Sequence, residues 1–584
     1  MSKCYDDFTK EELIKLLHKQ DEELAIKKYG LTWDSEKEPE QVVLDCENNL
    51  PILKRVADKE IKTDDSDYNL LIEGDNYHAL TVLNYTHKEK IDIIYIDPPY
   101  NTGNKDFKYN DCYVDKEDGY RHSKWLNFMD KRLRLAHNLL KDEGVIFISI
   151  DDNEQANLKL LCDKIFKEEN LIATLPRITK KGGKSSDNVQ KNHDYVMIYT
   201  KTNKGSLQQL EHNDSGFKYI DEYESERGKY KLNQTLDYDS LQYCPSLDYE
   251  IKLENKTFYP GSSKENYLER KKGKHQRADW AWRWSEELFE FGLKNGFIVV
   301  NHKTNRIYTK TYQNATIGTD EQGNYVVEIT PRKKALASIA LLENEYSNDN
   351  AKKELKNIVG KFKFDYPKPS QLIYDLVKRI KNKNAIVLDF TAGSGTTGHS
   401  VLKLNKDDGG NRHFILCTNN ENNICSNVCY PRISNIINGY NENSKKKKKI
   451  TGLSGNLQYY KTDLIPVERI NKINDSQREE LTLKAGEMIA IKENCFNQIE
   501  LNDYYQIFEN NTSTKRTAIY FREDVSDFDE LINKISDTKT TLYIFSYGRI
   551  DKKIYSYLKD NITIEDIPEP ILEIYKEINL TLRD

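Results

Sequence analysis

The sequence predicts an α/β protein whose core is a mostly parallel sheet. Three short runs of mainly apolar and β-branched residues support this prediction: LLIEGD at 70–75, IDIIYIDPPY at 91–100 and GVIFISID at 144–151. Helical patterns such as Trp125 to Leu140 separate them. Strands that alternate with helical patterns are typical of βαβ units, and nearly continuous apolar strands are typical of parallel sheets buried on both faces.

The same alternation returns after a long interruption. DYVMIYT at 194–200 closes the first half, and residues 202–355 then change to short mixed segments with many Tyr and polar turns. PKPSQLIYDLVKRI at 367–380 predicts a helix with Pro near its start. NAIVLDFTAGSGTTGHS at 384–400 and HFILCTNN at 413–420 again predict strand, Gly-rich turn, helix and strand. Residues 202–355 are therefore predicted to form a domain inserted into the core.

Further elements are predicted toward the two ends of the chain. Residues 9–30 predict a helix, with Thr9 and Glu12 as a capping box and Gly30 as the stop. Lys445 to Lys449 is expected to be a solvated loop at a boundary, beyond which residues 517–545 predict a small separate βαβ unit. The predicted division is a helical arm at 1–66, core halves at 67–201 and 356–444, the inserted domain at 202–355, and a small α/β domain at 450–584 for partner or dimer contacts.

Composition narrows the class of protein. A chain of 584 residues with 37% hydrophobic and 31% charged residues is foldable and too long for one core. The charged N-terminus lacks a signal peptide and no apolar run approaches roughly 18 residues, so we expect a cytoplasmic protein without a membrane partner. Nine Cys without a CxxC pair suggest neither disulfides nor a zinc site, and no metal is expected.

The Gly-rich turn that begins at Asp389 is the first candidate binding site. Its glycines allow backbone N–H groups to approach a ligand at a helix N-terminus. Gly393, Gly395 and Gly398 match a dinucleotide fingerprint, and the spacing also resembles a Walker A loop, which however needs Lys where His399 stands. An acid at the end of the strand would repel pyrophosphate and attract an ammonium or sulfonium group. The turn therefore favours a cationic ligand, and a tight turn without a ligand is the alternative.

Asp97-Pro98-Pro99-Tyr100 directly follows an apolar strand and is the second candidate. Ligands of α/β sheets gather at the carboxyl ends of the strands. The Asp97 carboxylate and the Pro98 carbonyl are suited to accept the two N–H bonds of an amine, and proline keeps them aimed. Tyr100 offers a face for stacking an aromatic base. A rigid turn at the end of the strand is the alternative interpretation. The Gly-rich loop that begins at Asp389 follows another strand of the same predicted sheet, and this favours the catalytic interpretation.

In this order the two motifs resemble those of the amino-methyltransferases of DNA in which Asp-Pro-Pro-Tyr precedes the cofactor loop. Several stretches, which together extend over most of the chain, resemble the modification subunit of type III restriction-modification systems. They are EGDNYHAL at 73–80, IDPPYNTGNKDF at 96–107, GVIFISIDDNE at 144–154, NHDYVMIYTK at 192–201, FDYPKPSQL at 364–372 and LDFTAGSGTT at 388–397.

The resemblance implies a Rossmann-like methyltransferase fold with a mostly parallel, seven-stranded sheet, helices on both faces and an inserted target-recognition domain. It implies transfer of a methyl group from S-adenosylmethionine to N6 of a flipped-out adenine in double-stranded DNA, without a metal or a covalent nucleophile. It also implies a restriction (Res) helicase-nuclease partner and a homodimer. The alternatives are N4-cytosine methylation, a DNA-binding specificity protein that has lost catalysis, and a nicotinamide dehydrogenase.

The resemblance also assigns residues to the cofactor. Lys368 would lie near the methionine carboxylate, Asp75 beside the adenosine, and Asn101 against the cofactor. The loop residues assigned to the cofactor are Asp389, Phe390, Ala392, Gly393, Ser394, Gly395, Thr396 and Thr397. One departure is that the strand at 413–418 ends in Thr418 and Asn419, where many methyltransferases carry an acid for the ribose hydroxyls. Either Glu421 takes that role or the hydroxyls are held otherwise.

The inserted domain is predicted to read DNA. Although the chain carries a net charge of -6, the segment from Lys264 to Arg283 holds seven basic residues against three acidic ones. A binding face can be locally basic on an acidic protein, and basic side chains near phosphates position the duplex. The residues assigned to DNA are Lys271, Lys272, Lys274, Arg277 and Arg283. In the alternative interpretation the charges are solvated, and Trp280, Trp282 and Trp284 alternate on a half-buried strand.

Overall fold

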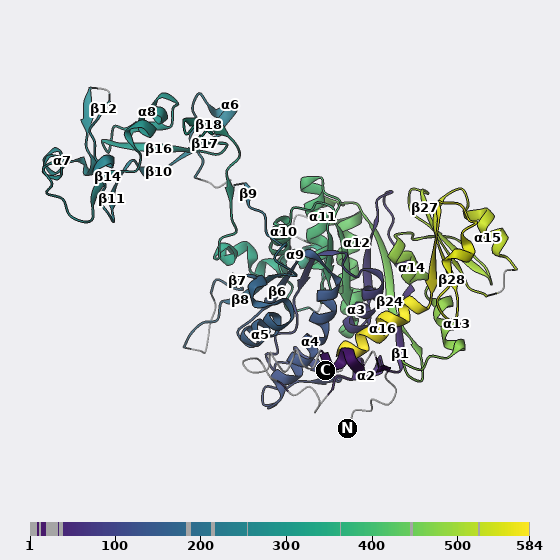
Figure 1. The fold of residues 1–584 in the computed structure, drawn as a ribbon. Helices are drawn as coiled ribbons and strands as arrows, with labels where there is room; N and C mark the ends of the chain where they lie inside the picture. Colours follow the sequence, from purple (N-terminus) through teal and green to yellow (C-terminus); the bar gives the residue numbers. More distant parts are fainter. Residues whose placement is uncertain are drawn as a thin grey trace. The chain divides into compact units, whose positions relative to one another are not determined.

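The computed structural model describes residues 9–10, 13–18, 33, 39–182, 188–211, 216–253, 255–361, 364–443, 448–523 and 526–582. The chain divides into two compact units, Met1–Leu207 with Ala337–Asp584, and Gln208–Leu336 (Figure 1). The second unit is an insertion in the first and is shorter than the predicted range 202–355. Residues after 336 belong to the first unit because helix α9 (Asn348–Val359) packs on α12 (Tyr430–Asn438).

The first unit is built on a nine-stranded sheet of order β1-β24-β2-β21-β20-β3-β6-β8-β7. The strands are β1 (Asn49–Arg55), β24 (Asn456–Pro466), β2 (Tyr68–Glu73), β21 (His413–Thr418), β20 (Ile386–Asp389), β3 (Ile91–Ile96), β6 (Leu140–Ile150), β8 (His193–Thr200) and β7 (Leu171–Ile178). All neighbours from β24 to β6 are parallel, whereas β1 and β8 run antiparallel to their neighbours. The predicted α/β class with a mostly parallel sheet is confirmed.

The predicted count of seven strands is wrong, because β24 and β1 extend the sheet beyond β2. All six residues of β2 are buried, so without a neighbour on that side the strand would present an open apolar edge. β24 pairs with β2 in parallel, and β1 closes the edge in antiparallel register. The predicted division placed β1 in the arm at 1–66 and β24 in the C-terminal domain, because the basic run from Lys445 to Lys449 predicts a boundary between the core and that domain.

Two groups of helices pack with this sheet (Figure 1). In the first group, α4 (Arg121–Leu139) contacts both α3 (Asn76–Thr86) and α5 (Gln155–Phe166), and the three share a hydrophobic core with β3 and β6. In the second group, α11 (Thr396–Asp408) contacts both α10 (Ser370–Lys378) and α12. The helix predicted at 367–380 is thus present as α10.

The C-terminal segment continues from β24 without forming a separate domain. Its elements are α13 (Asp475–Lys484), α14 (Gly486–Glu493), β25 (Asn497–Leu501), β26 (Tyr505–Glu509), β27 (Lys515–Tyr520), α15 (Phe528–Ile535), β28 (Lys539–Phe545), β29 (Ile562–Ile567) and α16 (Glu569–Leu582). β27 and β28 are parallel and joined by α15, so the predicted βαβ unit is present. It is not separate, because α14 and α16 both contact α3 and the Tyr575 hydroxyl donates to the Pro51 carbonyl at 2.6 Å.

Two predicted segments fall partly outside the described residues. Residues 13–18 of the predicted N-terminal helix are helical, and the Leu13 N–H donates to the Thr9 carbonyl at 3.0 Å. Glu12 and Gly30, the predicted cap partner and stop, lie outside the described residues, as do residues 445–447 of the basic run.

The second unit consists of small antiparallel sheets. Its strands are β9 (Leu210–Glu211), β10 (Tyr230–Thr235), β11 (Asp237–Ser240), β12 (Ile251–Leu253), β13 (Lys256–Phe258), β14 (Asp279–Trp282), β15 (Ile298–Asn301), β16 (Arg306–Tyr312), β17 (Ala315–Thr319), β18 (Tyr325–Ile329) and β19 (Lys333–Lys334). Its helices are α6 (Glu224–Arg227), α7 (Lys264–Lys271) and α8 (Glu286–Lys294). β10, β16 and β15 form the largest sheet, and Trp282, Phe289 and Ile307 belong to the unit's hydrophobic core.

Among the described residues, no helix is both long enough and apolar enough to cross a membrane. In the same residues, no group of three or more His, Cys, Asp or Glu side chains is arranged to hold a metal ion.

Candidate active site

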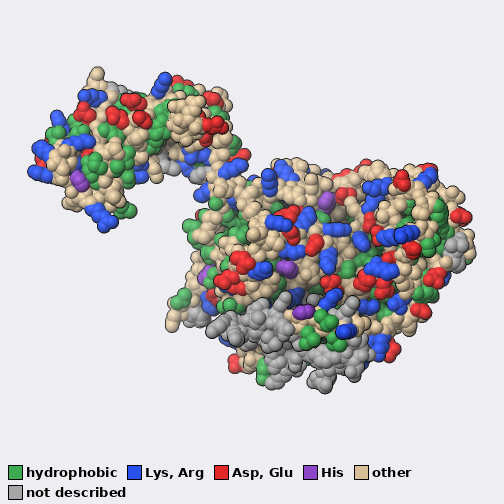
Figure 2. All heavy atoms as spheres, viewed as in Figure 1, with side chains coloured by type: hydrophobic (Ala, Val, Ile, Leu, Met, Phe, Trp, Pro, Cys, Tyr) green, Lys and Arg blue, Asp and Glu red, His purple; other side chains and the backbone are tan. Residues whose placement is uncertain are grey.

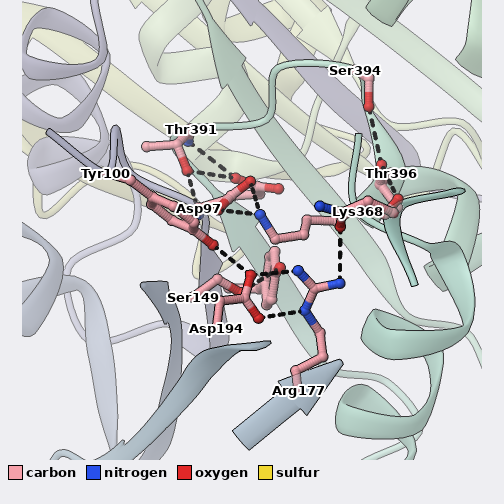
Figure 3. Close-up of polar contacts among 12 residues, drawn as sticks. Asp97, Tyr100, Ser149, Arg177, Asp194, Lys368, Thr391, Ser394 and Thr396 are labelled. Atoms are coloured by element: carbon pink, nitrogen blue, oxygen red, sulfur yellow. Dashed lines mark hydrogen bonds and ion pairs between the residues drawn. The ribbon is translucent and has the colours of Figure 1, made fainter. Parts of the chain in front are cut away.

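The two predicted motifs meet at one edge of the central sheet. β3 ends at Ile96, directly before Asp97, and its parallel neighbour β20 ends at Asp389. The Asp97 N–H donates to Thr391 Oγ1 at 2.8 Å, across 294 positions of sequence. The Thr391 N–H in turn donates to Asp389 Oδ1 at 3.0 Å (Figure 3). Thr391, which is not among the predicted site residues, therefore joins the tetrad to the Gly loop.

The Gly loop depends on glycine for both its conformation and its space. Gly393 and Gly395 have φ values of +48° and +73°, in the left-handed region that favours glycine. A Cβ on Gly393 would lie 3.1 Å from the Phe364 ring, and Gly395 is the N-cap of α11. The loop therefore brings backbone N–H groups to the N-terminus of a 13-residue helix, as predicted for a binding loop.

Asp389 is a buried acid whose hydrogen-bond donors in the described residues are threonine hydroxyls and a backbone N–H. Its side chain accepts hydrogen bonds from the Thr397 hydroxyl and the Thr391 N–H. Burial, with a smaller contribution from the nearby Asp97, raises the pKa of Asp389 to about 7 against the lowering effect of these hydrogen bonds. In the described part of the chain, no Lys, Arg or His forms an ion pair with it. Such a carboxyl gains most from a ligand that carries positive charge.

Lys368 lies against the tetrad. Its Nζ donates to both carboxylate oxygens of Asp97 at 2.6 Å and lies 4.8 Å from the centroid of the Tyr100 ring. Only 7% of the Lys368 side chain is exposed. The Thr396 hydroxyl donates to the Lys368 carbonyl at 3.2 Å, which ties this segment to the Gly loop. The resemblance placed Lys368 near a cofactor carboxylate, and the carboxylate that it binds in the structure is that of Asp97.

The rest of the tetrad is held by β7, β8 and α4. The Tyr100 hydroxyl donates to Asp194 Oδ2 at 3.0 Å, and the guanidinium of Arg177 binds both oxygens of Asp194. Trp125 Nε1 donates to the Pro99 carbonyl at 2.7 Å. Burial, with Asp194 and Asp97 nearby, holds the pKa of Tyr100 well above its ordinary value, so its hydroxyl stays a donor. Arg177 on β7 and Asp194 on β8 are not among the predicted site residues, although Asp194 lies in the stretch NHDYVMIYTK that carries part of the family resemblance.

Asn101, assigned to the cofactor by resemblance, is fully buried behind the tetrad. Its Nδ2 donates to Glu154 Oε1 at 2.5 Å and to the Arg121 carbonyl at 3.2 Å, while its Oδ1 has no partner among the residues that the structure describes. Glu154 also accepts from Asn157 and contacts His122 Nδ1 at 2.7 Å. The amide of Asn101 is therefore fixed, and its oxygen remains a buried acceptor for a ligand or a water molecule.

The hydroxyls at the N-terminus of α11 face a buried arginine. Arg432, on α12, donates to Ser394 Oγ at 3.3 Å and to Thr396 Oγ1 at 2.7 Å, and pairs with Glu354 at 3.0 Å. Phe390 and Ala392, the other assigned loop residues, are 1% and 6% exposed, and Phe390 packs in the hydrophobic core. These buried side chains therefore support the conformation of the Gly loop.

The neighbouring strand ends carry two acids with different partners. Asp75 follows β2, accepts the Tyr77 N–H at 2.7 Å as the N-cap of α3, and keeps 34% of its side chain exposed. Glu421, beyond the end of β21, pairs with Lys108 at 2.6 Å and accepts from the Tyr113 hydroxyl at 3.4 Å. Glu421 is the candidate to replace the acid that binds the ribose hydroxyls in many methyltransferases. It is therefore already paired with Lys108, which lies in the segment after the tetrad.

Some basic side chains of the stretch assigned to DNA already have partners within the second unit. All five residues assigned to DNA are exposed, and Lys and Arg side chains gather around α7 (Figure 2). Lys272 and Lys274, however, pair with Glu269 at 3.0 and 2.8 Å. Arg283 lies 4.5 Å from the centroid of the Tyr238 ring.

The tryptophans of this stretch belong mainly to the unit's interior. Trp282 is 2% exposed, and its Nε1 donates to the Tyr249 carbonyl at 2.7 Å. Trp280 and Trp284 are half-buried. Trp280 and Trp282 lie on β14, which ends before Trp284. The expectation of a half-buried strand therefore fits two of the three tryptophans.

Comparisons with known proteins agree with the motifs. The family model described as DNA methylase matches residues 91–428, more than half of the chain. The Mod subunit of the type III restriction-modification enzyme EcoPI from Escherichia phage P1 is 33% identical over 473 residues, covering 72% of this chain and 68% of that protein. The StyLTI Mod subunit from Salmonella typhimurium is 31% identical, covering 70% and 60%. The type II methyltransferase M.KpnI from Klebsiella pneumoniae is 31% identical, covering 64% and 85%.

These matches confirm the resemblance drawn from the sequence. The matched range of the family model begins at the first residue of β3 and extends beyond β21, so it contains both the tetrad and the Gly loop. The chain belongs to the DNA methylase family.

Proposed function

We propose that this chain methylates N6 of an adenine flipped out of double-stranded DNA, as the modification and specificity subunit of a type III restriction-modification system. The main support for the proposal is that Thr391 accepts the Asp97 N–H with its hydroxyl and donates its own N–H to the Asp389 side chain. These two hydrogen bonds hold the tetrad beside the Gly loop that begins at Asp389. The names of the EcoPI and StyLTI relatives support the type III assignment. Because the chain spans 68% and 60% of those two proteins, their wider activities are part of the proposal.

Three features of the site fit S-adenosylmethionine. Asp389 is a buried acid suited to the ligand's positive charge, Gly393 leaves the space that a Cβ would fill, and Asn101 Oδ1 is an unpartnered acceptor. Asp389 and the backbone of Gly393 and Gly395 would hold the methionine end, and Asp75, which follows β2 and keeps 34% of its side chain exposed, would lie beside the adenosine. When bound, the cofactor supplies a methyl group that is already activated on a sulfonium sulfur.

The tetrad has to improve a poor nucleophile. The lone pair of an adenine amine is delocalised into the ring, and acceptors for both N–H bonds favour a pyramidal nitrogen and disperse the developing charge. The Asp97 carboxylate and the Pro98 carbonyl would be those acceptors. Trp125 occupies the Pro99 carbonyl and so fixes the turn that aims them. The ring of Tyr100 would stack on the extruded base.

The ion pair with Lys368 is compatible with this role. Each carboxylate oxygen has two lone pairs, so Asp97 can accept an N–H bond of the amine while Lys368 remains bound. The pairing also places a cation beside the tetrad before any substrate arrives.

DNA recognition is proposed for the second unit, residues 208–336. The exposed side chains of Lys271, Lys272 and Lys274 would contact phosphates and position the duplex, whereas sequence would be read at base edges. A Res helicase-nuclease subunit is the proposed cleavage partner, supported by the relatives' description as Mod subunits of restriction-modification enzymes. A homodimer of this chain is part of the same proposal.

The test is methylation-sensitive long-read sequencing of DNA from a methylation-free host that expresses the chain, with an Asp97→Ala variant as the control. The expected result is N6-methyladenine at one sequence context, present with the wild-type chain and absent with the variant. N4-methylcytosine instead would contradict the adenine assignment. Specific DNA binding and cofactor binding without any methylation would support the silent specificity protein.

A further inference from the structure

The hydroxyl of Tyr100 is engaged at the end of a buried chain of charges (Figure 3). It donates to Asp194 Oδ2 at 3.0 Å, and Arg177 Nε donates to Asp194 Oδ1 at 2.7 Å. A further guanidinium nitrogen of Arg177 donates to the Tyr346 carbonyl at 2.6 Å and to Asn348 Oδ1 at 3.1 Å. The acceptor of the Tyr100 hydroxyl is therefore fixed from its far side.

The position of this pair makes it rigid. Arg177 and Asp194 lie opposite each other on the antiparallel strands β7 and β8, and their side chains are 0% and 2% exposed. Neither side chain can swing into solvent without breaking the pair, and a lone buried charge is strongly unfavourable. The Asp194 carboxylate that accepts the Tyr100 hydroxyl is therefore held in a single orientation.

Stability alone does not account for a charged pair at this position. Replacing a buried ion pair by well-packed apolar side chains is often neutral or stabilising, because two charges must lose their water to form the pair. What an apolar pair would not provide is an acceptor for the tyrosine hydroxyl. The last torsion of a tyrosine side chain is broad, so without that hydrogen bond the plane of the ring is held only by packing and by the contact with Lys368.

We propose that Asp194 and Arg177 are positioning residues that hold the Tyr100 ring in the plane on which the flipped base stacks. The inference rests on the proposed function, since it assigns the ring to that base. Neither residue touches the reacting atoms. Both act through the hydroxyl of Tyr100, and their loss misaligns the base relative to Asp97 while the cofactor pocket stays intact.

Two changes separate this role from a purely structural clamp. Tyr100→Phe keeps the ring and removes the hydroxyl. Arg177→Met combined with Asp194→Leu removes the acceptor and leaves no unpaired buried charge, so this variant is expected to fold. Tyr195→Phe is the matched control, because Tyr195 is the next residue on β8 and its hydroxyl also donates to a carboxylate at 3.0 Å, that of Asp152, outside the site.

The measurement is single-turnover methylation of a duplex that contains the sequence identified by methylation sequencing. A hydrogen bond to a charged group is expected to be worth about 10- to 100-fold in the rate. Tyr100→Phe and the Arg177/Asp194 pair variant should each lose that factor, while the combination of all three changes should lose no more than either alone. Tyr195→Phe should match the wild type, and the affinity for S-adenosylmethionine should be unchanged throughout.

A second signal reports the base itself. In a duplex with 2-aminopurine in place of the target adenine, the wild type should quench the fluorescence of the extruded base by stacking, and the Tyr100→Phe and pair variants should leave it brighter. Losses that multiply in the combined variant, or Tyr100→Phe at the wild-type rate, would overturn the inference even if the pair variant failed to fold. An inactive wild type that binds S-adenosylmethionine would count against the proposed function instead.

Discussion

Replacing Asp389 by Asn tests the electrostatic basis of the proposed cofactor site. Burial raises the pKa of Asp389 to about 7, so in the cofactor-free protein its carboxyl is mainly protonated below pH 7 and mainly ionised above it. If the carboxylate is the form that receives the positive charge of S-adenosylmethionine, affinity must rise with pH through this range. The asparagine variant keeps the shape of the side chain and cannot ionise.

The size of the effect follows from the fraction ionised. With a pKa of about 7, about one tenth of the Asp389 carboxyls are ionised at pH 6 and about nine tenths at pH 8. An apparent dissociation constant scales inversely with the competent fraction, so the wild type should bind the cofactor about tenfold more weakly at pH 6 than at pH 8. The Asp389→Asn variant should lack this contribution.

Isothermal titration calorimetry of both proteins at pH 6, 7 and 8 provides the assay. The cofactor's own amine titrates in both experiments, so the ratio of the two affinities isolates Asp389. That ratio should change by about tenfold between pH 6 and pH 8, in favour of the wild type at pH 8. A ratio that stays constant would refute this assignment, because Asp389 would then not face the charge of the cofactor.

The raised pKa of Asp389 also predicts how the stability of the cofactor-free protein depends on pH. The folded-state pKa of Asp389 lies above the ordinary value of 3.8, so its contribution to stability is present at low pH and is lost as pH rises through 7. Without cofactor, the unfolding free energy of the wild type relative to Asp389→Asn should fall by about 1.4 kcal/mol between pH 6 and pH 8. Urea unfolding of the two proteins measures this difference.

Three further predictions concern the tetrad, the loop and the inserted unit. Asp97→Ala should lower the methylation rate by about 100- to 1,000-fold while calorimetry shows cofactor binding largely preserved; substantial activity under saturating cofactor would contradict the mechanism. Gly393→Val should abolish cofactor binding in a folded protein, because valine is strained at a φ of +48° and its Cβ would crowd the Phe364 ring; unchanged affinity would place the pocket elsewhere. Changing Lys271, Lys272 and Lys274 together to Ala should weaken binding to all duplexes without moving the methylated adenine, and should reduce the slope of log affinity against log salt by at most about 0.9 for each phosphate that is no longer neutralised; an unchanged slope in filter binding would exclude these lysines from the DNA interface.

The parts of the site that could be predicted from sequence have local signals. A buried parallel strand appears in the sequence as a continuous apolar run. Asp97 ends no such run but follows one directly, and Asp389 is the last residue of another. Both therefore lie at the carboxyl ends of the strands, where ligands of α/β sheets bind. A Gly-rich turn before a helix is equally local, because it reflects the φ values of Gly393 and Gly395.

The parts that could not be predicted depend on partners far away in sequence. Lys368 meets Asp97 across 271 positions, and no local pattern distinguishes that carboxylate from one on a ligand. Arg177 meets Asp194 only because β7 and β8 pair in one register. β24 follows the basic run from Lys445 to Lys449, which predicts a domain boundary, and its place in the central sheet depends on the edge of β2, which is far away in sequence.

The inserted unit begins and ends in a two-stranded ribbon in which β9 and β19 pair antiparallel, with Glu211 opposite Lys333 and Leu210 opposite Lys334. Neighbouring strands are about 4.8 Å apart, so the chain leaves and returns at almost the same point. A segment with adjacent ends can be replaced by recombination as one contiguous cassette, because the gap that the remaining chain must bridge does not change. Every tetrad and loop residue is encoded outside this cassette. Under the role in DNA recognition proposed for this unit, exchange of a single gene segment would change the DNA specificity and leave the residues of the tetrad and the Gly loop untouched.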